Sequence, residues 1–209
     1  MNLVQTISTV VDWLNESVCS QITLKLPDDR KNDADYTVTM VNPAAFPLYV
    51  PGKDRLPPSV AAPIPSVCVQ LMEGSDDLLQ SRRKLQIRLC LACWNPGTHG
   101  GEIFRPRENP DAVGGVSYYR ISDDADQTYT RNMDGWKDSF NFADLVLREL
   151  ENAEYIGGLR LAKESPIKFG LFTEDGNVWD YYPYWHNWIS FELEAGIPPR
   201  IPATYENLL

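Results

Sequence analysis

The sequence is poor in the residues and motifs that mark enzymes. It has two histidines, His99 and His186, and neither lies at metal-ligand spacing from a carboxylate or a second histidine. The signatures G-x-G-x-x-G, G-x-x-x-x-G-K-[ST], G-x-S-x-G and H-E-x-x-H are missing as well. We therefore expect no catalytic residue, no cofactor and no metal, and we expect that the protein is not an enzyme.

Cysteine is also scarce. Four cysteines in 209 residues are too few for a disulfide scaffold, which fits a reducing compartment. Cys90 and Cys93 have the C-x-x-C spacing of half a zinc knuckle, but no second pair exists. Because successive side chains of a strand point to opposite faces, these two thiols should face opposite ways. The sequence thus favours small core or strand residues over metal ligands.

Long hydrophobic runs and a positive leader are missing too. No apolar stretch approaches the roughly 20 residues of a membrane-spanning helix, and the first residues, MNLVQTISTVVDWL, have no cationic segment. We therefore expect a protein that stays in the cytosol and has no membrane partner.

Basic residues are fewer than acidic residues in this chain. The 19 Lys and Arg residues face 29 Asp and Glu, for a net charge of -10, and such a surface repels nucleic acid backbones. The only basic run is Arg82, Arg83 and Lys84. Its position at the start of a predicted strand favours a solvated strand edge over a phosphate site, and Arg82 and Arg83 are candidate interface residues.

Two segments have apolar residues at helical spacing. In 3–14 they stand three and four residues apart, as in an amphipathic helix. A second helix should begin near Asp138 or Ser139, since either side chain can cap free backbone N–H groups, and should end before Gly157 and Gly158. Its predicted apolar side consists of Phe140, Ala143, Val146, Leu147 and Leu150.

Alternation of apolar and polar residues predicts the strands. The clearest case is 84–93, where Leu85 and Ile87 alternate with Lys84 and Gln86. A polar stretch between the first two predicted strands indicates a hairpin. The predicted strands span 22–26, 36–41, 67–71, 84–93, 166–172 and 188–194.

Three segments lack such periodicity. The range 43–65 contains seven prolines, too many for a helix or a central strand, and is predicted to be an extended arm outside the core. The range 95–136 is rich in Gly, Asp, Asn and Tyr and is predicted to be a long contact loop. The range 195–209 is predicted to be a C-terminal arm. Together these features predict one α+β domain over 1–209, with a mainly antiparallel sheet covered by two helices.

Aromatic residues gather just before the last predicted strand. Trp and Tyr concentrate at protein interfaces, where they bury area and keep a polar group in contact with water. The candidate interface residues here are Tyr182, Tyr184, Trp185 and Trp188. Nearby carboxylates keep open an alternative, a carbohydrate-binding or glycosidase-like site that uses the aromatic block 179–188.

The order of these elements resembles that of phage tail-terminator and tail-completion proteins. The phrases VNPAAFPLYVPGKDRLPPSV, PSVCVQLMEG and YYPYWHNWISFEL resemble a small protein encoded among the head–tail joining genes of contractile-tailed prophages of Gram-positive bacteria. The likeness spans most of the chain. The range 95–136 is longer than in the minimal pattern of the family.

The resemblance implies a structural protein of the virion neck, assembled in the host cytoplasm. Such proteins form a homo-oligomeric ring, commonly a hexamer, that caps the tail tube, meets the sheath protein and joins the tail to the head–tail connector. DNA would only pass through the lumen. The alternative within the same resemblance is another connector or head-completion protein of the neck.

Overall fold

A seven-stranded sheet forms the centre of the computed structural model, which describes residues 2–27, 39–98, 104–108, 110, 116–120, 130–131, 135–178 and 181–197. Its strands lie in the order β10-β11-β15-β5-β4-β3, and β12 also pairs with β15. All pairs are antiparallel except β3 with β4. The bounds are β3 (Ala44–Pro47), β4 (Ser66–Asp77), β5 (Arg82–Trp94), β10 (Tyr155–Ile156), β11 (Leu159–Leu161), β12 (Lys168–Leu171) and β15 (Tyr184–Gly196).

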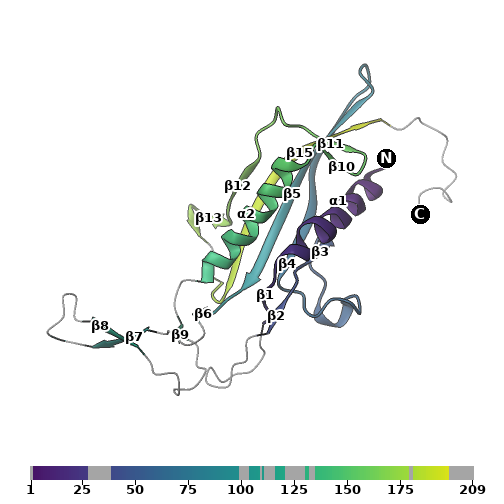
Figure 1. Cartoon of the computed structure of the whole chain (residues 1–209). Coiled ribbons are helices and arrows are strands. Elements are labelled where there is room, and N and C mark those ends of the chain that lie inside the picture. Colours follow the sequence, from purple (N-terminus) through teal and green to yellow (C-terminus); the bar gives the residue numbers. More distant parts are fainter. Residues whose placement is uncertain are drawn as a thin grey trace.

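Two helices, α1 (Leu3–Ser17) and α2 (Trp136–Asn152), cover the same face of this sheet (Figure 1). Asn2 and Gln5 form a capping box at the start of α1, and Val10 and Leu14 are fully buried in the core. An α+β fold with a mainly antiparallel sheet and two helices is thereby confirmed. Neither helix of the described ranges is long and apolar enough to cross a membrane.

The predicted start of the second helix is wrong by two to three residues. The helix begins at Trp136, and its N-cap is Gly135, which has no capping side chain. Asp138 and Ser139 therefore lie inside the first turn. Phe142 is fully buried although the sequence analysis did not place it on the apolar side, whereas Phe140 is only half-buried. Ala143, Val146 and Leu150 of the predicted apolar side are buried, so most of that side is confirmed.

The two long strands divide the sheet into two faces, as their alternation predicts. Side chains opposite one another in an antiparallel pair share a face, so the register assigns each residue. Toward the helices point Leu85, Ile87, Leu89 and Leu91 of β5 and Ile189, Phe191 and Leu193 of β15. The opposite face, here called the polar face, carries Lys84, Gln86, Arg88 and Cys90 of β5 and Trp188, Ser190, Glu192 and Glu194 of β15.

The prediction that 43–65 is an arm outside the core is wrong for its first residues. Residues 44–46 are buried in β3, which pairs in parallel with β4 at the edge of the sheet. The Asn15 side chain of α1 accepts a hydrogen bond from the backbone N–H of Ala45. Proline is compatible with an edge strand, which needs hydrogen bonds on one side only. The remainder continues through a 3-10 turn at Lys53–Arg55.

Short antiparallel pairs complete the described structure. The predicted hairpin is present as β1 (Leu24–Lys25) and β2 (Met40–Val41), while residues 28–38 lie outside the described ranges. Within 95–136, where no regular structure was predicted, two pairs occur. The remaining bounds are β6 (Gly97–Thr98), β7 (Phe104–Glu108), β8 (Val116–Arg120), β9 (Thr130–Arg131), β13 (Thr173–Glu174), β14 (Asn177–Val178) and a 3-10 turn at Cys19–Gln21.

Two further predictions differ from the structure: the role of Gly157 and Gly158, and the start of the C-terminal arm. Gly157 and Gly158 were expected only to end the helix, but they form the turn between β10 and β11, where Gly157 has a positive φ of 58°. The predicted C-terminal arm begins too early, because β15 runs through Gly196. Residues 198–209 lie outside the described ranges.

Candidate functional site

The predicted aromatic residues come together where β15 begins beside the end of β5. Tyr184 stands opposite Trp94, and Trp185 stands opposite Cys93. Trp94 is buried and packs against Tyr184 and Ile64. We call the group Trp94, Tyr182, Tyr184, Trp185 and Trp188 the aromatic corner.

Three side chains of the aromatic corner donate hydrogen bonds to backbone carbonyl groups. The indole N–H of Trp185 donates to the carbonyl of Asn95 at 2.8 Å, and the Tyr182 hydroxyl donates to the carbonyl of Pro96 at 2.6 Å. The indole N–H of Trp188 donates to the carbonyl of Leu171 at 3.1 Å. These three donors are engaged within the fold and are not available to the hydroxyl groups of a sugar. The bonds support a structural role for Tyr182, Trp185 and Trp188.

Gly135 marks a close approach between the aromatic corner and the start of α2. A Cβ atom at this position would lie 2.2 Å from the carbonyl oxygen of Asn95 and 2.4 Å from Nε1 of Trp185. Only glycine fits without a shift of the backbone. This contact explains why the helix begins at a residue without a capping side chain.

The two residues predicted as caps join α2 to the strands instead. The Asp138 carboxylate accepts from the Asn95 side chain at 2.6 Å and pairs with the Lys25 ammonium group at 3.1 Å. The buried Asn187 amide donates to the backbone carbonyl and hydroxyl of Ser139 at 2.9 and 2.8 Å. These polar bonds fix the first turn of α2 against β15.

His186 lies next to Trp185 in β15, on the polar face, and its ring centroid is 5.8 Å from that of Tyr181. Burial lowers the pKa of His186 below its usual range, since a partly dehydrated imidazole resists protonation. In the unfolded chain the imidazole takes up a proton at a higher pH than in the folded protein. Protonation therefore favours the unfolded state.

We expect the free energy of unfolding to fall as the pH drops below about 6.5, the ordinary histidine value. Denaturant unfolding of the wild type and of His186→Gln between pH 8 and pH 5 measures the contribution of this group. The wild type should lose more stability than the variant over that range. Equal losses would show that His186 does not contribute.

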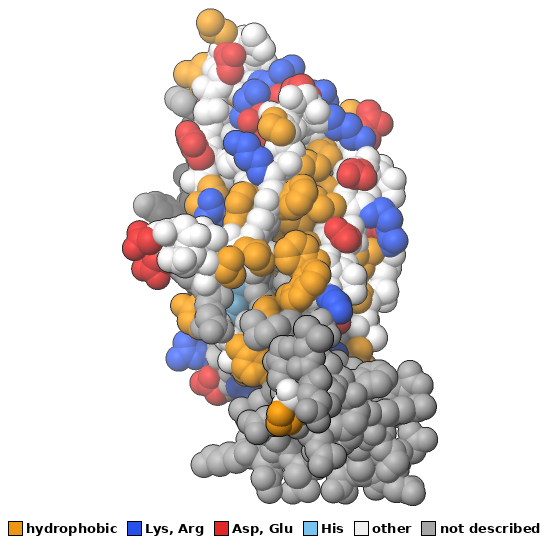
Figure 2. Space-filling model, turned by 90° about the vertical axis from the view of Figure 1, so that its left-hand side faces the viewer, with side chains coloured by type: hydrophobic (Ala, Val, Ile, Leu, Met, Phe, Trp, Pro, Cys, Tyr) orange, Lys and Arg blue, Asp and Glu red, His pale blue; other side chains and the backbone are white. Residues whose placement is uncertain are grey.

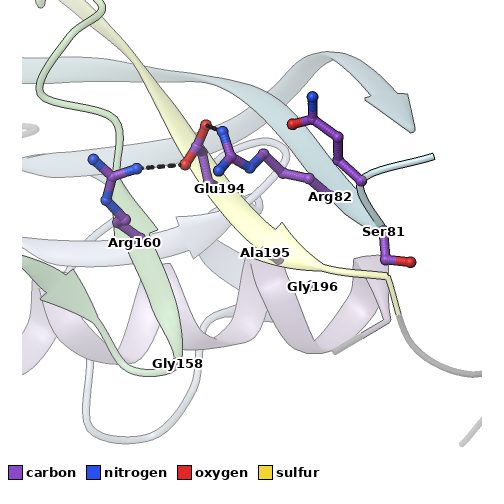
Figure 3. A pocket seen from close by; sticks show the side chains of 8 residues that line it. Ser81, Arg82, Gly158, Arg160, Glu194, Ala195 and Gly196 are labelled. Atoms are coloured by element: carbon purple, nitrogen blue, oxygen red, sulfur yellow. Dashed lines mark hydrogen bonds and ion pairs between the residues drawn. The ribbon is translucent and has the colours of Figure 1, made fainter. Parts of the chain in front are cut away.

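The opposite end of the sheet is charged. Glu194, whose side chain is 6% exposed, stands between Lys84 and Arg160 in the register. Its carboxylate bonds Arg160 at 2.7 Å and Arg82 at 3.4 Å, and Lys84 lies 3.9 Å away. Figure 3 shows Arg82 and Arg160 reaching this carboxylate from two sides of a hollow of about 300 Å³.

Arg82 and Arg83, predicted together as interface residues, point to opposite faces. Arg82 faces Glu194, whereas Arg83 forms a two-bond contact with Asp76, at 2.6 and 2.8 Å, within the β4–β5 hairpin. Both lie at the end of β5 far from the aromatic corner. The structure thus places the six candidate interface residues in two separate groups.

The β4–β5 hairpin extends beyond the helices at one end of the molecule (Figure 1). The Asp77 carboxylate holds its turn by accepting from the backbone N–H groups of Leu79 and Gln80. Leu78 is 66% exposed and Leu79 is 99% exposed. A projecting turn with two adjacent exposed leucines is a feature of protein contact sites.

A second apolar area lies on the side of the molecule shown in Figure 2, where a band of hydrophobic side chains runs between charged margins. Exposed apolar residues of α2, β12 and β14 include Trp136, Phe169 and Val178. Trp136 also packs edge-on against Phe140, with ring centroids 5.6 Å apart. The described surface thus offers apolar area at more than one place.

The cysteines occupy the positions that strand alternation predicts. Cys93 is buried on the side of the helices, and Cys90 lies half-buried on the polar face, where its thiol donates to the Gln70 side chain at 3.3 Å. Burial raises the pKa of Cys19, Cys68 and Cys93 to about 12. Within the described ranges, no three His, Cys, Asp or Glu residues form a group that could hold a metal ion.

Sequence reasoning missed Arg88, Gly135 and Glu194. Strand alternation could have placed Arg88 and Glu194 on one face, but it gives no pairing between strands. Gly135 has no local signal, because its role depends on Asn95 and Trp185. No protein-family model, curated protein or solved structure matches this chain.

Proposed function

We propose that this chain is a structural subunit of the neck of a contractile phage tail or tail-like particle, and that it forms a ring that terminates the tail tube. The proposal includes contacts with the tube, the sheath and the head–tail connector, with DNA only passing through the lumen. It rests on the resemblance of three long phrases of the sequence to proteins encoded among head–tail joining genes. The function proposed is structural and not catalytic.

The structural observation that supports assembly is the projecting β4–β5 hairpin with its exposed Leu78 and Leu79. Water contact of two adjacent leucines is unfavourable by roughly 1.5 to 3 kcal/mol per side chain relative to full burial. The turn is held by Asp77 and by the Arg83–Asp76 pair, so it presents the leucines on a defined backbone. Such an element suits the reciprocal contacts of a cyclic assembly.

We expect the purified protein, alone or with its tail-tube partner, to form closed rings in electron micrographs and a matching mass by light scattering. Leu79→Asp should weaken assembly about tenfold or more, because it places a charge in a contact core. Its fold should be retained, since Leu79 is 99% exposed in the subunit.

Met40→Asp is the matched control, because it introduces the same charge at an exposed apolar residue of β2, away from the hairpin and from the second apolar area. A strictly monomeric wild type at high concentration, with no binding to tube ends, would contradict the proposed function. Equal assembly of both variants and the wild type would remove the hairpin as its support.

A further inference from the structure

Arg88 is a cation in the middle of the polar face, and no acid among the described residues pairs with it. Its guanidinium carbon lies 5.8 Å from the centroid of the Trp188 ring. The Nε atom is buried and has no hydrogen-bond partner. No ion pair joins this half-buried arginine to a carboxylate of the described ranges, whereas neighbouring Lys84 pairs with Glu192.

A partly buried arginine without an acid is costly, because its Nε atom has lost contact with water and no hydrogen bond replaces it. A carboxylate is the matching ligand, since its two oxygens accept parallel bonds from the planar guanidinium group. The Trp188 ring lies against the Arg88 guanidinium group in a cation–π contact. The position therefore has the chemistry of an anion-binding site.

A second cation stands in the same row of the sheet. Gln70, Arg88, Ser190 and Lys168 face one another across β4, β5, β15 and β12. Lys168 is exposed and makes no ion pair with the described residues. Gln70 and Ser190 are already engaged within the fold, since Gln70 bonds Leu48 and Cys90 and the buried Ser190 hydroxyl donates to the carbonyl of Ile87. The row therefore offers a ligand its two positive charges, Arg88 and Lys168.

A polyanion suits this row less well than a protein carboxylate. The next row of the same face carries Glu73 and Glu192 on either side of Gln86. These acids repel a chain of phosphate groups more strongly than they repel a single carboxylate. The net charge of -10 acts in the same direction.

The opposite side of the molecule supplies such carboxylates. The helix α1 contains no Lys or Arg, and its acids Asp12 and Glu16 are exposed. Asp144 and Glu151 of α2 are exposed too. None of these acids forms an ion pair with another described residue. One copy therefore has acids on its helical side and free cations on the polar face of its sheet.

We propose that Arg88 and Lys168 form a carboxylate-binding site for a second copy of this chain, which supplies acidic side chains from the exposed surface of α1 or α2. The two surfaces are different, so the contact is heterologous, the type that closes into rings. This inference rests on the proposed ring assembly and names the contact between neighbouring subunits. Charge complementarity of this kind fixes register and orientation.

The first test measures assembly. Arg88→Glu should raise the dissociation constant of the oligomer about tenfold or more, because the site then repels the acids of the neighbour. Arg55→Glu is the control, since it makes the same charge change at an exposed arginine of the 3-10 turn. Circular dichroism confirms that each variant is folded.

The second test detects the contact directly by chemical cross-linking. Arg88→Lys places an amine at the site, and a zero-length carbodiimide reagent then joins it to any carboxylate in direct contact. Ordinary and heavy-isotope protein are mixed before assembly. We expect mixed-isotope peptides that link position 88 or Lys168 to Asp12, Glu16, Asp144 or Glu151.

The outcomes separate this inference from the proposed function. Rings that form equally well with Arg88→Glu, or links at position 88 only within one chain, overturn the site and leave the ring proposal intact. A wild type that never assembles overturns both. Binding of a double-stranded oligonucleotide that Arg88→Glu abolishes, without mixed-isotope links, shows a phosphate site and also overturns the inference.

Discussion

Trp185→Ala should reduce the free energy of unfolding by about 3 to 5 kcal/mol, the range for large aromatic residues packed in a core. Trp185 packs against the main core although it is half-buried. Its removal also leaves the carbonyl of Asn95 without the indole N–H at 2.8 Å. Both losses occur at the point where β15, β5 and the start of α2 meet.

Urea unfolding, monitored by far-UV circular dichroism instead of tryptophan fluorescence, measures this change in the free energy of unfolding. Trp185→Phe is the informative control, because it keeps an aromatic ring against the core and removes the indole N–H. Loss of that hydrogen bond costs about 1 kcal/mol, to which the smaller ring adds a packing loss. A Trp185→Ala protein of nearly wild-type stability that no longer assembles would show that Trp185 is a contact residue and not a structural one.

Glu194→Gln should reduce the free energy of unfolding by about 2 kcal/mol. Removal of one partner from a buried ion pair typically costs about 3 to 5 kcal/mol, because the remaining charge is left without compensation. Here Arg82, Lys84 and Arg160 are nearly half exposed, with side-chain exposures of 44 to 48%, so water takes over part of the lost interaction. The amide keeps the shape of the side chain.

Glu164→Gln is the matched control, since Glu164 also bonds Arg160 but its side chain is 50% exposed. We expect little change in stability for that exposed pair, because water screens its charges. Thermal unfolding and urea unfolding of both variants measure the difference. Equal effects of the two substitutions would show that burial of Glu194 does not strengthen its interactions.

Local periodicity was sufficient for much of the fold. The alternation in β5 and the final strand predicted which residues face the core and that Cys90 and Cys93 face opposite ways. The spacing in 3–14 predicted α1. These properties depend on neighbours within a few residues, which the sequence displays directly.

Composition failed where pairing between distant segments decided the structure. The proline content of 43–65 correctly indicated poor helix formation, but it could not show that β3 would pair with β4 and bury Phe46. The start of α2 was misplaced because capping residues were weighed by local preference. The contact of Gly135 with Asn95 and Trp185 determines that start.

The sequence by itself determined the α+β class, the two amphipathic helices, the two faces of the long strands and the acidic balance of the chain. Only the tertiary structure decided which side chains on those faces meet. Arg82 and Glu194 are 112 residues apart and form an ion pair, whereas Arg88, on the same strand as Arg82, pairs with no acid of the part of the chain that the structure describes. The reason is physical: side-chain period follows from the local backbone, but strand order and register follow from packing of the whole core.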